Sequence, residues 1–336
     1  MTTAVATAGP VSRGRAVGQM VARRLAFAVP VLGLVALGVF LLGAASPFDP
    51  IYQYYGVGIF TASDAEIAQV RQTLNLDAPV LVQFGQWLGG LVTGDLGTSR
   101  SLRQPVVEVL AERVPWSLLL AGTGLVLAVV LALILGVLTA WRQGGWLDRL
   151  VTAGAHALEG LPSFVLALVA IAALALGLGW LPAGGLTDSG ADATFGQVIR
   201  HLVLPAAVLG VSQAPWLVLH LRASLLTALA EDHVTGARSR GLAEHVVVLR
   251  HALPTALLPM VTLLGARLPE LVTGAVLVEA VFSWPGIASA VVSAALDVDF
   301  PLLAAITLLT TAAVLVGALL ADVAVVLFDP RVRADG

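Results

Sequence analysis

Residues 116–141, WSLLLAGTGLVLAVVLALILGVLTAW, form an apolar run without one ionisable side chain. An α-helix needs roughly 20 mostly apolar residues to cross about 30 Å of hydrocarbon, and this run is long enough. Lipid offers the backbone no hydrogen-bond partner, so a spanning segment must satisfy its amides within a helix. The run therefore predicts a membrane-spanning helix and places the chain among the membrane proteins.

Five more apolar runs lie on either side of this segment. They cover residues 25–45, 161–181, 202–221, 252–282 and 302–328. The acidic and basic residues within them are few, namely Arg267, Glu270 and Glu279 in one run and Asp322 in another. With the first run, they predict an all-α polytopic membrane protein of six transmembrane helices.

The composition excludes several classes of protein. Of the 336 residues, 58% are hydrophobic and 12% are charged, whereas a soluble domain has about 25% charged residues. All 18 basic residues are arginine, and the net charge of -3 lacks the basic excess of a nucleic-acid-binding protein. Without lysine or cysteine there is no P-loop lysine and no thiolate ligand, and no H-E-x-x-H string occurs. We therefore expect no catalytic residue, no metal site and no bound cofactor in this chain.

The distribution of arginine predicts the orientation in the membrane. If the N-terminus is cytoplasmic, the inner segments hold 11 arginines in 65 residues and the outer segments 5 in 109. Because positive residues concentrate on the cytoplasmic side, both termini are predicted to be cytoplasmic. The predicted parts are a cytoplasmic segment 1–24, a first span 25–45, an extracytoplasmic insertion 46–114, a transmembrane domain 115–328 and a cytoplasmic tail 329–336.

A cleaved signal peptide is the alternative interpretation of the first apolar run. Arg23 and Arg24 precede it, and the small residues Gly43, Ala44 and Ala45 end it. However, its apolar core of 21 residues exceeds the 7 to 15, roughly, that signal peptides use. A membrane anchor is therefore the preferred prediction.

The insertion 46–114 contains two helical patterns. Ser63 and Glu66 have the spacing of a capping box, which marks the start of a short helix. Further along, apolar residues repeat at helical spacing, namely Val80, Phe84, Trp87, Leu88 and Leu91. We expect this second, amphipathic helix to pack over the bundle, with attachment to the outer membrane surface as the alternative.

The predicted cytoplasmic loop 229–250 contains the sequence EDHVTGARSRGL at 231–242. Its small and polar residues predict a short helix that ends at Gly241. Small side chains allow close backbone approach, so this helix suits insertion into a groove of a partner protein. A solvated helix between two spans is the alternative.

Several motifs resemble one family of membrane proteins. The loop strings DHV, ARxxGL and RHAL look like the EAA-type coupling loop of ABC importer permeases. Other strings are similar to the dipeptide, oligopeptide and nickel permeases of that family: LNLDxP at 74–79, QFxxW at 83–87, GDLGxS at 94–99, EAVFSWPG at 279–286 and DPRVR at 329–333. The resemblance covers residues 20–333, although His233 stands where the family usually has an aromatic residue.

The resemblance implies a multi-pass subunit of the bacterial cytoplasmic (inner) membrane, embedded in lipid. It implies half of a translocation path for small peptides or peptide-like solutes, with nickel or a metal chelate as the alternative cargo. The implied partners are a second permease, related or identical, two ATPase subunits that use ATP and Mg²⁺, and an extracytoplasmic solute-binding protein. The residues of the implied contact with the ATPase subunit are Glu231, Asp232, Ala237, Arg238, Gly241 and Leu242.

Charged residues inside predicted spans need a partner or a water-filled path, because each costs about 2.5–3.5 kcal/mol in the bilayer interior. Arg267 and Glu270 are three residues apart on one helix face, which predicts a local ion pair, with pore lining as the alternative. The resemblance implies that other residues are structural anchors of loop ends, namely Glu279, Pro285, Gly286, Asp322, Asp329 and Arg331.

Two other functional classes compete with a permease subunit. An ion-coupled secondary transporter commonly shows repeated halves, and this sequence has no repeat of fixed period. An intramembrane serine protease needs a serine beside a histidine. Ser212 and His220 are eight residues apart on one predicted helix, which separates them by about 12 Å along the axis. We therefore prefer the permease.

Overall fold

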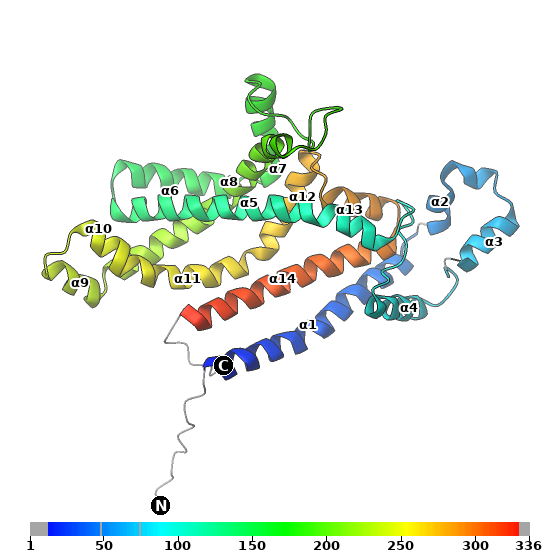
Figure 1. Cartoon of the computed structure of the whole chain (residues 1–336), viewed down its shortest axis with the longest axis horizontal. Coiled ribbons are helices and arrows are strands. Elements are labelled where there is room, and N and C mark those ends of the chain that lie inside the picture. The colour runs from blue at the N-terminus through cyan, green and yellow to red at the C-terminus, as the bar shows by residue number, and fades with distance from the viewer. Residues whose placement is uncertain (1–12, 48, 74, 329–336) are drawn as a thin grey trace, which may run out of the picture.

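The computed structural model describes residues 13–47, 49–73 and 75–328 as a bundle of helices (Figure 1). In chain order the elements are α1 (Arg13–Ala44), α2 (Pro50–Tyr55), the 3-10 helix η1 (Gly56–Phe60), α3 (Asp64–Thr73), α4 (Val80–Thr93), α5 (Val106–Trp141), α6 (Trp146–Glu159), α7 (Ser163–Ala170), the π-helix η2 (Ile171–Gly177), α8 (Phe195–Leu229), α9 (Asp232–Ser239), α10 (Glu244–Val246), the π-helix η3 (Val247–Ala252), α11 (Leu253–Ala266), α12 (Leu268–Val281), α13 (Ile287–Leu296) and α14 (Phe300–Phe328). No strand forms among these described residues. The predicted all-α class is confirmed.

Five described helices are long and apolar enough to cross a membrane. They are Val17–Ala44, Val106–Trp141, Phe195–Leu229, Glu244–Gly265 and Phe300–Ala324. A sixth candidate is α6 joined to the α7–η2 helix, and these two segments meet at a bend of 107°. The described chain thus has five or six candidate spans, and the third predicted span belongs to a bent pair rather than to one straight helix.

The fifth predicted span, 252–282, is also divided. α11 ends at Ala266 and α12 begins at Leu268, with Arg267 between them. Pro269 lies in the first turn of α12, where its missing N–H is tolerated, but in a continuous helix its ring would clash with the carbonyl of Gly265, four residues earlier. Apolar content predicts one continuous helix here, and the proline overrides it. The break leaves a charged residue at an irregular point of the backbone.

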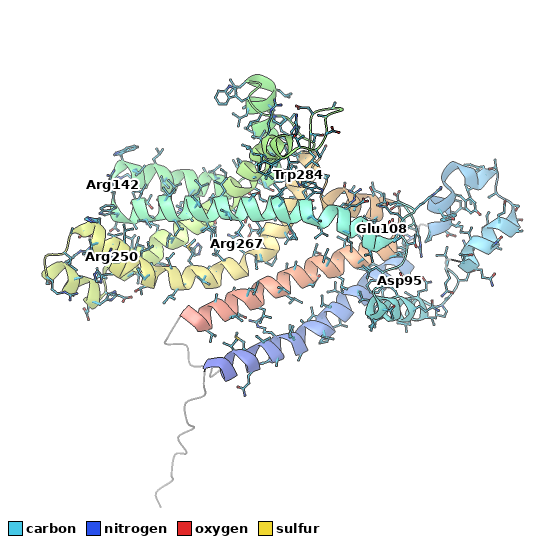
Figure 2. The ribbon with its side chains drawn as sticks, viewed as in Figure 1. Asp95, Glu108, Arg142, Arg250, Arg267 and Trp284 are labelled. Atoms are coloured by element: carbon cyan, nitrogen blue, oxygen red, sulfur yellow. The ribbon has the colours of Figure 1, made fainter. Side chains whose placement is uncertain are left out.

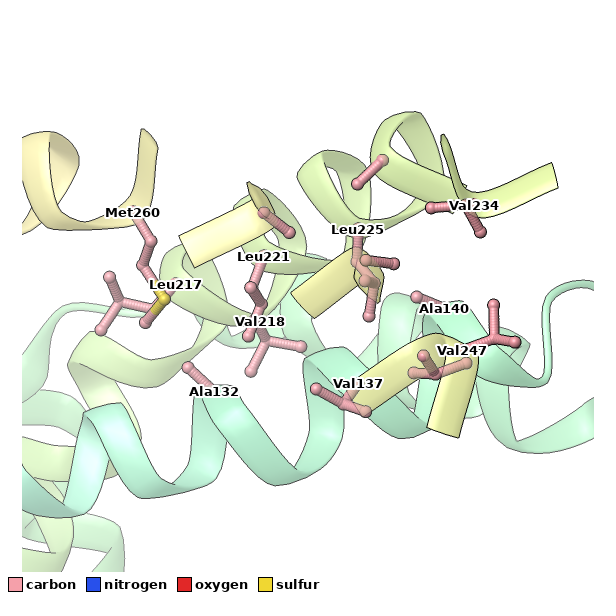
Figure 3. Close-up of a cluster of buried hydrophobic side chains, with 14 of the residues drawn as sticks. Ala132, Val137, Ala140, Leu217, Val218, Leu221, Leu225, Val234, Val247 and Met260 are labelled. Atoms are coloured by element: carbon pink, nitrogen blue, oxygen red, sulfur yellow. The ribbon is translucent and has the colours of Figure 1, made fainter. Parts of the chain in front are cut away.

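α5 and α8 lie side by side at the centre of the bundle (Figure 1). A Cβ atom on Gly124 of α5 would lie 2.7 Å from the Leu209 side chain of α8, and one on Gly210 of α8 would lie 2.8 Å from Leu127 of α5. Glycine therefore permits an approach that a larger residue prevents. Buried side chains that fill the rest of the interface include Ala132, Val137, Leu217, Leu221 and Leu225 (Figure 3).

The helix that follows Ser63 begins with the predicted capping box. The Ser63 amide and hydroxyl each donate to the Glu66 carboxylate at 2.8 Å. In return the Glu66 amide donates to the Ser63 hydroxyl at 3.3 Å. The hydrogen bonds from Ser63 favour the ionised carboxylate, so they lower the pKa of Glu66.

The amphipathic helix α4 packs against α1. The rings of Phe84 and Trp87 lie 5.7 and 5.5 Å from the ring of Phe40 on α1, measured between centroids. Val80 and Leu91 join the same cluster, whereas Leu88 is exposed. The predicted packing of this helix over the bundle is confirmed.

α5 extends further toward the insertion than its apolar run indicates. It begins at Val106, within the predicted insertion 46–114. Val106 and Val109 are fully buried beside the α1–α4 cluster. The first turns of α5 therefore belong to the bundle.

Candidate functional site

The loop 229–250 forms a cap at the end of the bundle opposite α2 and α3 (Figure 1). Val234 and Ala237, on the inner face of α9, are fully buried. They share a core cluster with Leu225 of α8 and Val247 of η3 (Figure 3). α9 is thus packed against the bundle and is not a solvated loop without tertiary contacts.

Arg238 shapes the turn that follows α9. Its Nη2 and Nε donate to the two carboxylate oxygens of Glu244 at 2.7 and 3.3 Å, and its Nη1 donates to the Leu229 carbonyl at 3.3 Å. The hydrogen bond to Glu244 raises the pKa of Arg238. Between the two partners, Gly241 has a φ of +77°, a left-handed conformation that favours glycine. Arg238 and Gly241 therefore set the shape of the loop from within.

The structure separates the predicted contact residues into an inner and an outer group. Ala237 was expected to offer a partner close approach, and this is corrected because the residue is wholly buried in the chain's own core. Arg238 is engaged with Glu244, and Glu231 lies 3.1 Å from the His233 ring. The remaining three predicted residues, Asp232, Gly241 and Leu242, are exposed. Together with the exposed residues Thr235, Gly236 and Ser239 they form what we name the α9 outer face.

A second cluster lies midway along the bundle, at the break between α11 and α12 (Figure 2). Arg267 forms an ion pair with Glu270, at the spacing noted in the sequence. Its guanidinium carbon also lies 4.2 Å from the centre of the Trp216 ring on α8. Nη2 lies 4.0 Å from the carboxylate of Glu159, at the end of α6. The charged groups thus come from the end of α6, the α11–α12 break and the first turn of α12, and Trp216 of α8 packs against them.

This cluster lines a cavity of about 310 Å³. Ser212, Gln213 and Thr273 add uncharged polar groups to the lining. Sequence reasoning missed Glu159 and Gln213 as members, because they come from separate helices that only the fold brings together. The available signals were Gln213 inside an apolar run and the Gly160-Leu161-Pro162 break beside Glu159.

Glu279 and Gly286 meet in the turn between α12 and α13. Glu279 is 1% exposed, and its carboxylate accepts a hydrogen bond from the Ala288 amide at 2.9 Å. A Cβ atom on Gly286 would lie 2.3 Å from the Glu279 carboxyl carbon, so glycine leaves the space that the carboxylate fills. Pro285 is half-buried in the same turn. These contacts support the structural role that the resemblance implies for these residues.

Asp322 is the anchor nearest the C-terminus that the structure describes. It forms an ion pair with Arg24, and this contact joins α14 to α1. The sequence gives no signal for this partner, because the two residues lie near opposite ends of the chain. Asp329 and Arg331 lie outside the described residues.

Two buried carboxylates have roles that sequence reasoning did not single out. Asp299, just before α14, accepts hydrogen bonds from the Ser99 hydroxyl at 2.7 Å and the Ser101 amide at 3.0 Å. It thereby ties the segment between α4 and α5 to α14. Asp148 of α6 accepts two hydrogen bonds from Arg222 of α8, at 2.6 and 2.8 Å. Each partner is distant in sequence, so neither pair follows from local pattern.

A metal site or a catalytic pair would need suitable side chains held close together. Within 13–47, 49–73 and 75–328, no cluster of three His, Asp or Glu side chains is placed to hold a metal ion. The Ser212 hydroxyl donates to the Leu209 carbonyl, and the His220 ring contacts the Trp216 carbonyl, both at 2.8 Å. Both side chains are thus engaged with the backbone of α8.

Candidate spanning helices surround a polar cavity in this membrane protein, and comparison with known proteins assigns it to a family of transport components. Residues 114–334 match the family described as the binding-protein-dependent transport system inner membrane component, and residues 17–121 match its N-terminal family. The chain belongs to this family and is a multi-pass inner-membrane component.

The chain is similar over nearly its whole length to curated permeases. It is 34% identical to a putative peptide permease protein of Brucella suis biovar 1 (strain 1330), with 92% of this chain and 97% of that protein aligned. It is 33% identical to the oligopeptide transport system permease protein AppB of Bacillus subtilis (strain 168), with 93% and 98% aligned. A probable peptide ABC transporter permease protein of Sinorhizobium fredii is 32% identical, with 94% and 99% aligned.

Proposed function

We propose that this chain is the permease subunit of an ATP-driven, binding-protein-dependent importer of small peptides or peptide-like solutes. The names of the relatives support peptide cargo, and the family description supports delivery by a binding protein. In this proposal the chain forms half of the translocation path and has no enzymatic activity of its own. ATP and Mg²⁺ are used by two ATPase subunits, and a second permease supplies the other half of the path.

The observation that carries the coupling role is the two-sided packing of α9. Asp232, Thr235, Gly236 and Ser239 recur at the spacing of one helix face, and all are exposed. The opposite face is buried against α8 and η3 through Val234 and Ala237. An ATPase subunit that docks on the α9 outer face therefore moves α8, and α8 also lines the central cavity.

The proposed orientation follows from the arginine distribution and fits the shape of the molecule. α9 and the short helices α2 and α3 lie at opposite ends of the bundle (Figure 1). With α9 and both termini in the cytoplasm, the insertion lies outside, where a solute-binding protein delivers its cargo.

The coupling proposal is tested by a pair of neighbouring substitutions. Gly236→Leu adds a side chain on the α9 outer face, where no other atom lies within 4 Å of the Cβ position. We expect normal amounts of folded permease, with ligand-stimulated ATP hydrolysis and uptake lowered by at least about tenfold, since a lost docking contact of 1.4 kcal/mol has that effect.

Ala237→Leu is the matched control, because the residue is buried in the chain's own core. Overpacking there destabilises the permease itself by about 1–3 kcal/mol, so we expect less folded protein. Normal coupled transport in Gly236→Leu would reject the docking face.

The cargo is tested with vesicles that contain the complete transporter. Labelled di- and tripeptides and a nickel chelate are supplied with the binding protein, with ATP depletion and collapse of ion gradients as separate treatments. We expect peptide uptake that stops with ATP depletion and persists without ion gradients. Uptake of the chelate alone would overturn the peptide assignment, and uptake driven by an ion gradient would overturn the ATP-driven mechanism.

A further inference from the structure

Two breaks between helices and one proline within a helix meet at the central cavity. The breaks are the sharp bend at 160–162 between α6 and α7 and Arg267 between α11 and α12, and the proline is Pro215 inside the continuous helix α8. All three sites line the cavity of about 310 Å³. Irregular backbone at membrane depth is tolerated where it is buried in protein or lines a water-filled space. The charged and polar side chains in its lining suit a water-accessible space.

The charged groups of the cavity are incompletely paired with one another. Arg267 contacts Glu270 closely, but the Glu159 carboxylate lies 4.0 Å from Arg267 and 3.9 Å from the His156 ring. Those two separations exceed hydrogen-bond length. The side chains of Glu159 and Glu270 are 41% and 57% exposed. One guanidinium thus faces two accessible carboxylates, and a further positive group would balance the charge.

The same cavity also offers positions for a negative group. α7 begins at Ser163, and α12 begins directly after Arg267; both of these residues line the cavity. The N-terminal amides and dipole of α7 favour an anion. At α12 the C-terminus of α11 comes directly before and Pro269 lacks an N–H, so the contribution there is the full positive charge of the Arg267 guanidinium. Stacking over the Trp216 ring holds this guanidinium in place.

We infer that this cavity is a solute-contact site of the translocation path and that it accepts a small zwitterion. The free ammonium of the solute lies against Glu159. Its free carboxylate lies against Arg267, where it replaces the carboxylate of Glu270 as the partner of the guanidinium. An unblocked short peptide carries both groups, and the cavity is at the lower end of the roughly 300–1,000 Å³ that ligand pockets occupy. This inference rests on the proposed function and adds to it the residues and the chemistry of contact.

A purely structural ion pair is the competing interpretation of these residues. Such a pair is expected in dry, close packing, because packing is what holds its geometry. Here both carboxylates are open to the cavity, and each side of the pair lies beside a helix end. The solute-contact site accounts for the cavity, the exposed carboxylates and the convergent helix ends together.

The test uses thiol protection, because the chain has no native cysteine. In membranes that contain the complete transporter, Ser212→Cys is labelled with a small charged thiol reagent while trialanine is titrated as the protectant. We expect labelling that trialanine slows. Trialanine blocked at both ends should need at least about tenfold higher concentrations, since hydrogen bonds to charged groups contribute that much.

The variant Glu159→Gln should reduce this difference between free and blocked peptide, because it removes the partner of the ammonium and leaves Arg267 for the carboxylate. Glu108→Gln is the matched control, since Glu108 is exposed and lies apart from Arg267 toward the α2–α4 end (Figure 2). Absence of labelling, or equal protection by the two peptides, would overturn the site. Peptide uptake by the wild-type complex is measured in the same membranes. If no peptide is taken up, the proposed function fails. If uptake is normal but free and blocked trialanine protect Ser212→Cys equally, only the proposed role of the cavity fails.

Discussion

Single buried carboxylates accept the hydrogen bonds that hold the starts of α13 and α14 in place. Glu279 caps the start of α13, where the residue at the N-cap position, Gly286, has no side chain to do so. Asp299 performs a similar task between Ser99 and the start of α14, through bonds to Ser99 and to the Leu302 amide. Each buried acid satisfies backbone or hydroxyl donors inside the protein, where an unpaired polar group would be costly. These residues therefore act through the backbone they hold.

At the residue scale, Gly286→Ala should destabilise the permease. The new Cβ would lie 2.3 Å from the Glu279 carboxyl carbon. The Glu279 side chain is buried, so it has little room to move aside. We expect a loss of about 1–3 kcal/mol in stability, as for other overpacked sites. The measurement is the thermal midpoint of the purified permease in detergent.

The control for this substitution is Gly122→Ala, on α5. No atom lies within 4 Å of the Cβ position there. Its thermal midpoint should equal that of the wild type or exceed it slightly, because alanine favours helix over glycine. Equal midpoints for both variants would contradict the proposed contact between Gly286 and Glu279.

The helices owe their behaviour to what they pack against. α9 is too short to be stable alone in water, since isolated helices below about 12–15 residues are marginal. Val234 and Ala237 attach it to the core, and the Arg238–Glu244 pair closes its turn. α9 is consequently anchored to the bundle by its own buried side chains and by this pair.

At the element scale, Gly241→Val should impair coupling more than membrane insertion. Gly241 has a φ of +77° with no atom within 4 Å of its Cβ position, so the change acts through backbone strain alone. A non-glycine residue in a disfavoured conformation costs about 1–3 kcal/mol, and the turn after α9 should shift to relieve it. We expect normal protein levels with reduced ligand-stimulated ATP hydrolysis.

Gly241→Asn is the matched control, because asparagine tolerates left-handed geometry better than valine does. It should retain most of the stimulated ATP hydrolysis. If Gly241→Val behaves like Gly241→Asn, the conformation of this turn has no part in coupling.

The molecule as a whole is long and has two distinct ends. α9 and α10 lie at one end, and α2, α3 and α4 lie at the other (Figure 1). The polar cavity lies between them, and α8 connects it to the α9 end. The proposed function assigns solute delivery to the α2–α4 end and contact with the ATPase subunits to the α9 end.

At the scale of the molecule, the topology is tested by single cysteines. Ser99 belongs to the insertion but is buried and bonded to Asp299, so a residue of α3 is a better outer probe. Ala65→Cys should react with an impermeant thiol reagent in intact cells, and Ser239→Cys should react after the inner face is opened; both positions are exposed. The reverse pattern would refute the proposed orientation.

Local sequence determined the class of fold and several details within it. Apolar runs long enough to cross the bilayer must satisfy their backbone hydrogen bonds within a helix, because lipid offers none. The all-α architecture therefore follows without tertiary information. The capping box at Ser63 and the apolar stripe of α4 are also local, since each depends on residues within a few turns. The approach of Arg267 to Glu270 depends on a spacing of three residues, and it too could be predicted.

Tertiary structure decided which of these features act together. Ala237 seemed suited to a partner by its size, but only the packing of α9 on α8 shows that it is buried. The break beside Glu159, the break at Arg267 and Pro215 of α8 lie in different parts of the chain, and nothing in the sequence says that they share a cavity. Hydropathy registers how apolar a segment is, whereas the meeting of distant segments depends on side-chain shape and helix bends throughout the bundle. The sequence alone therefore determines that this is a helical membrane protein, and only the tertiary structure determines the cavity.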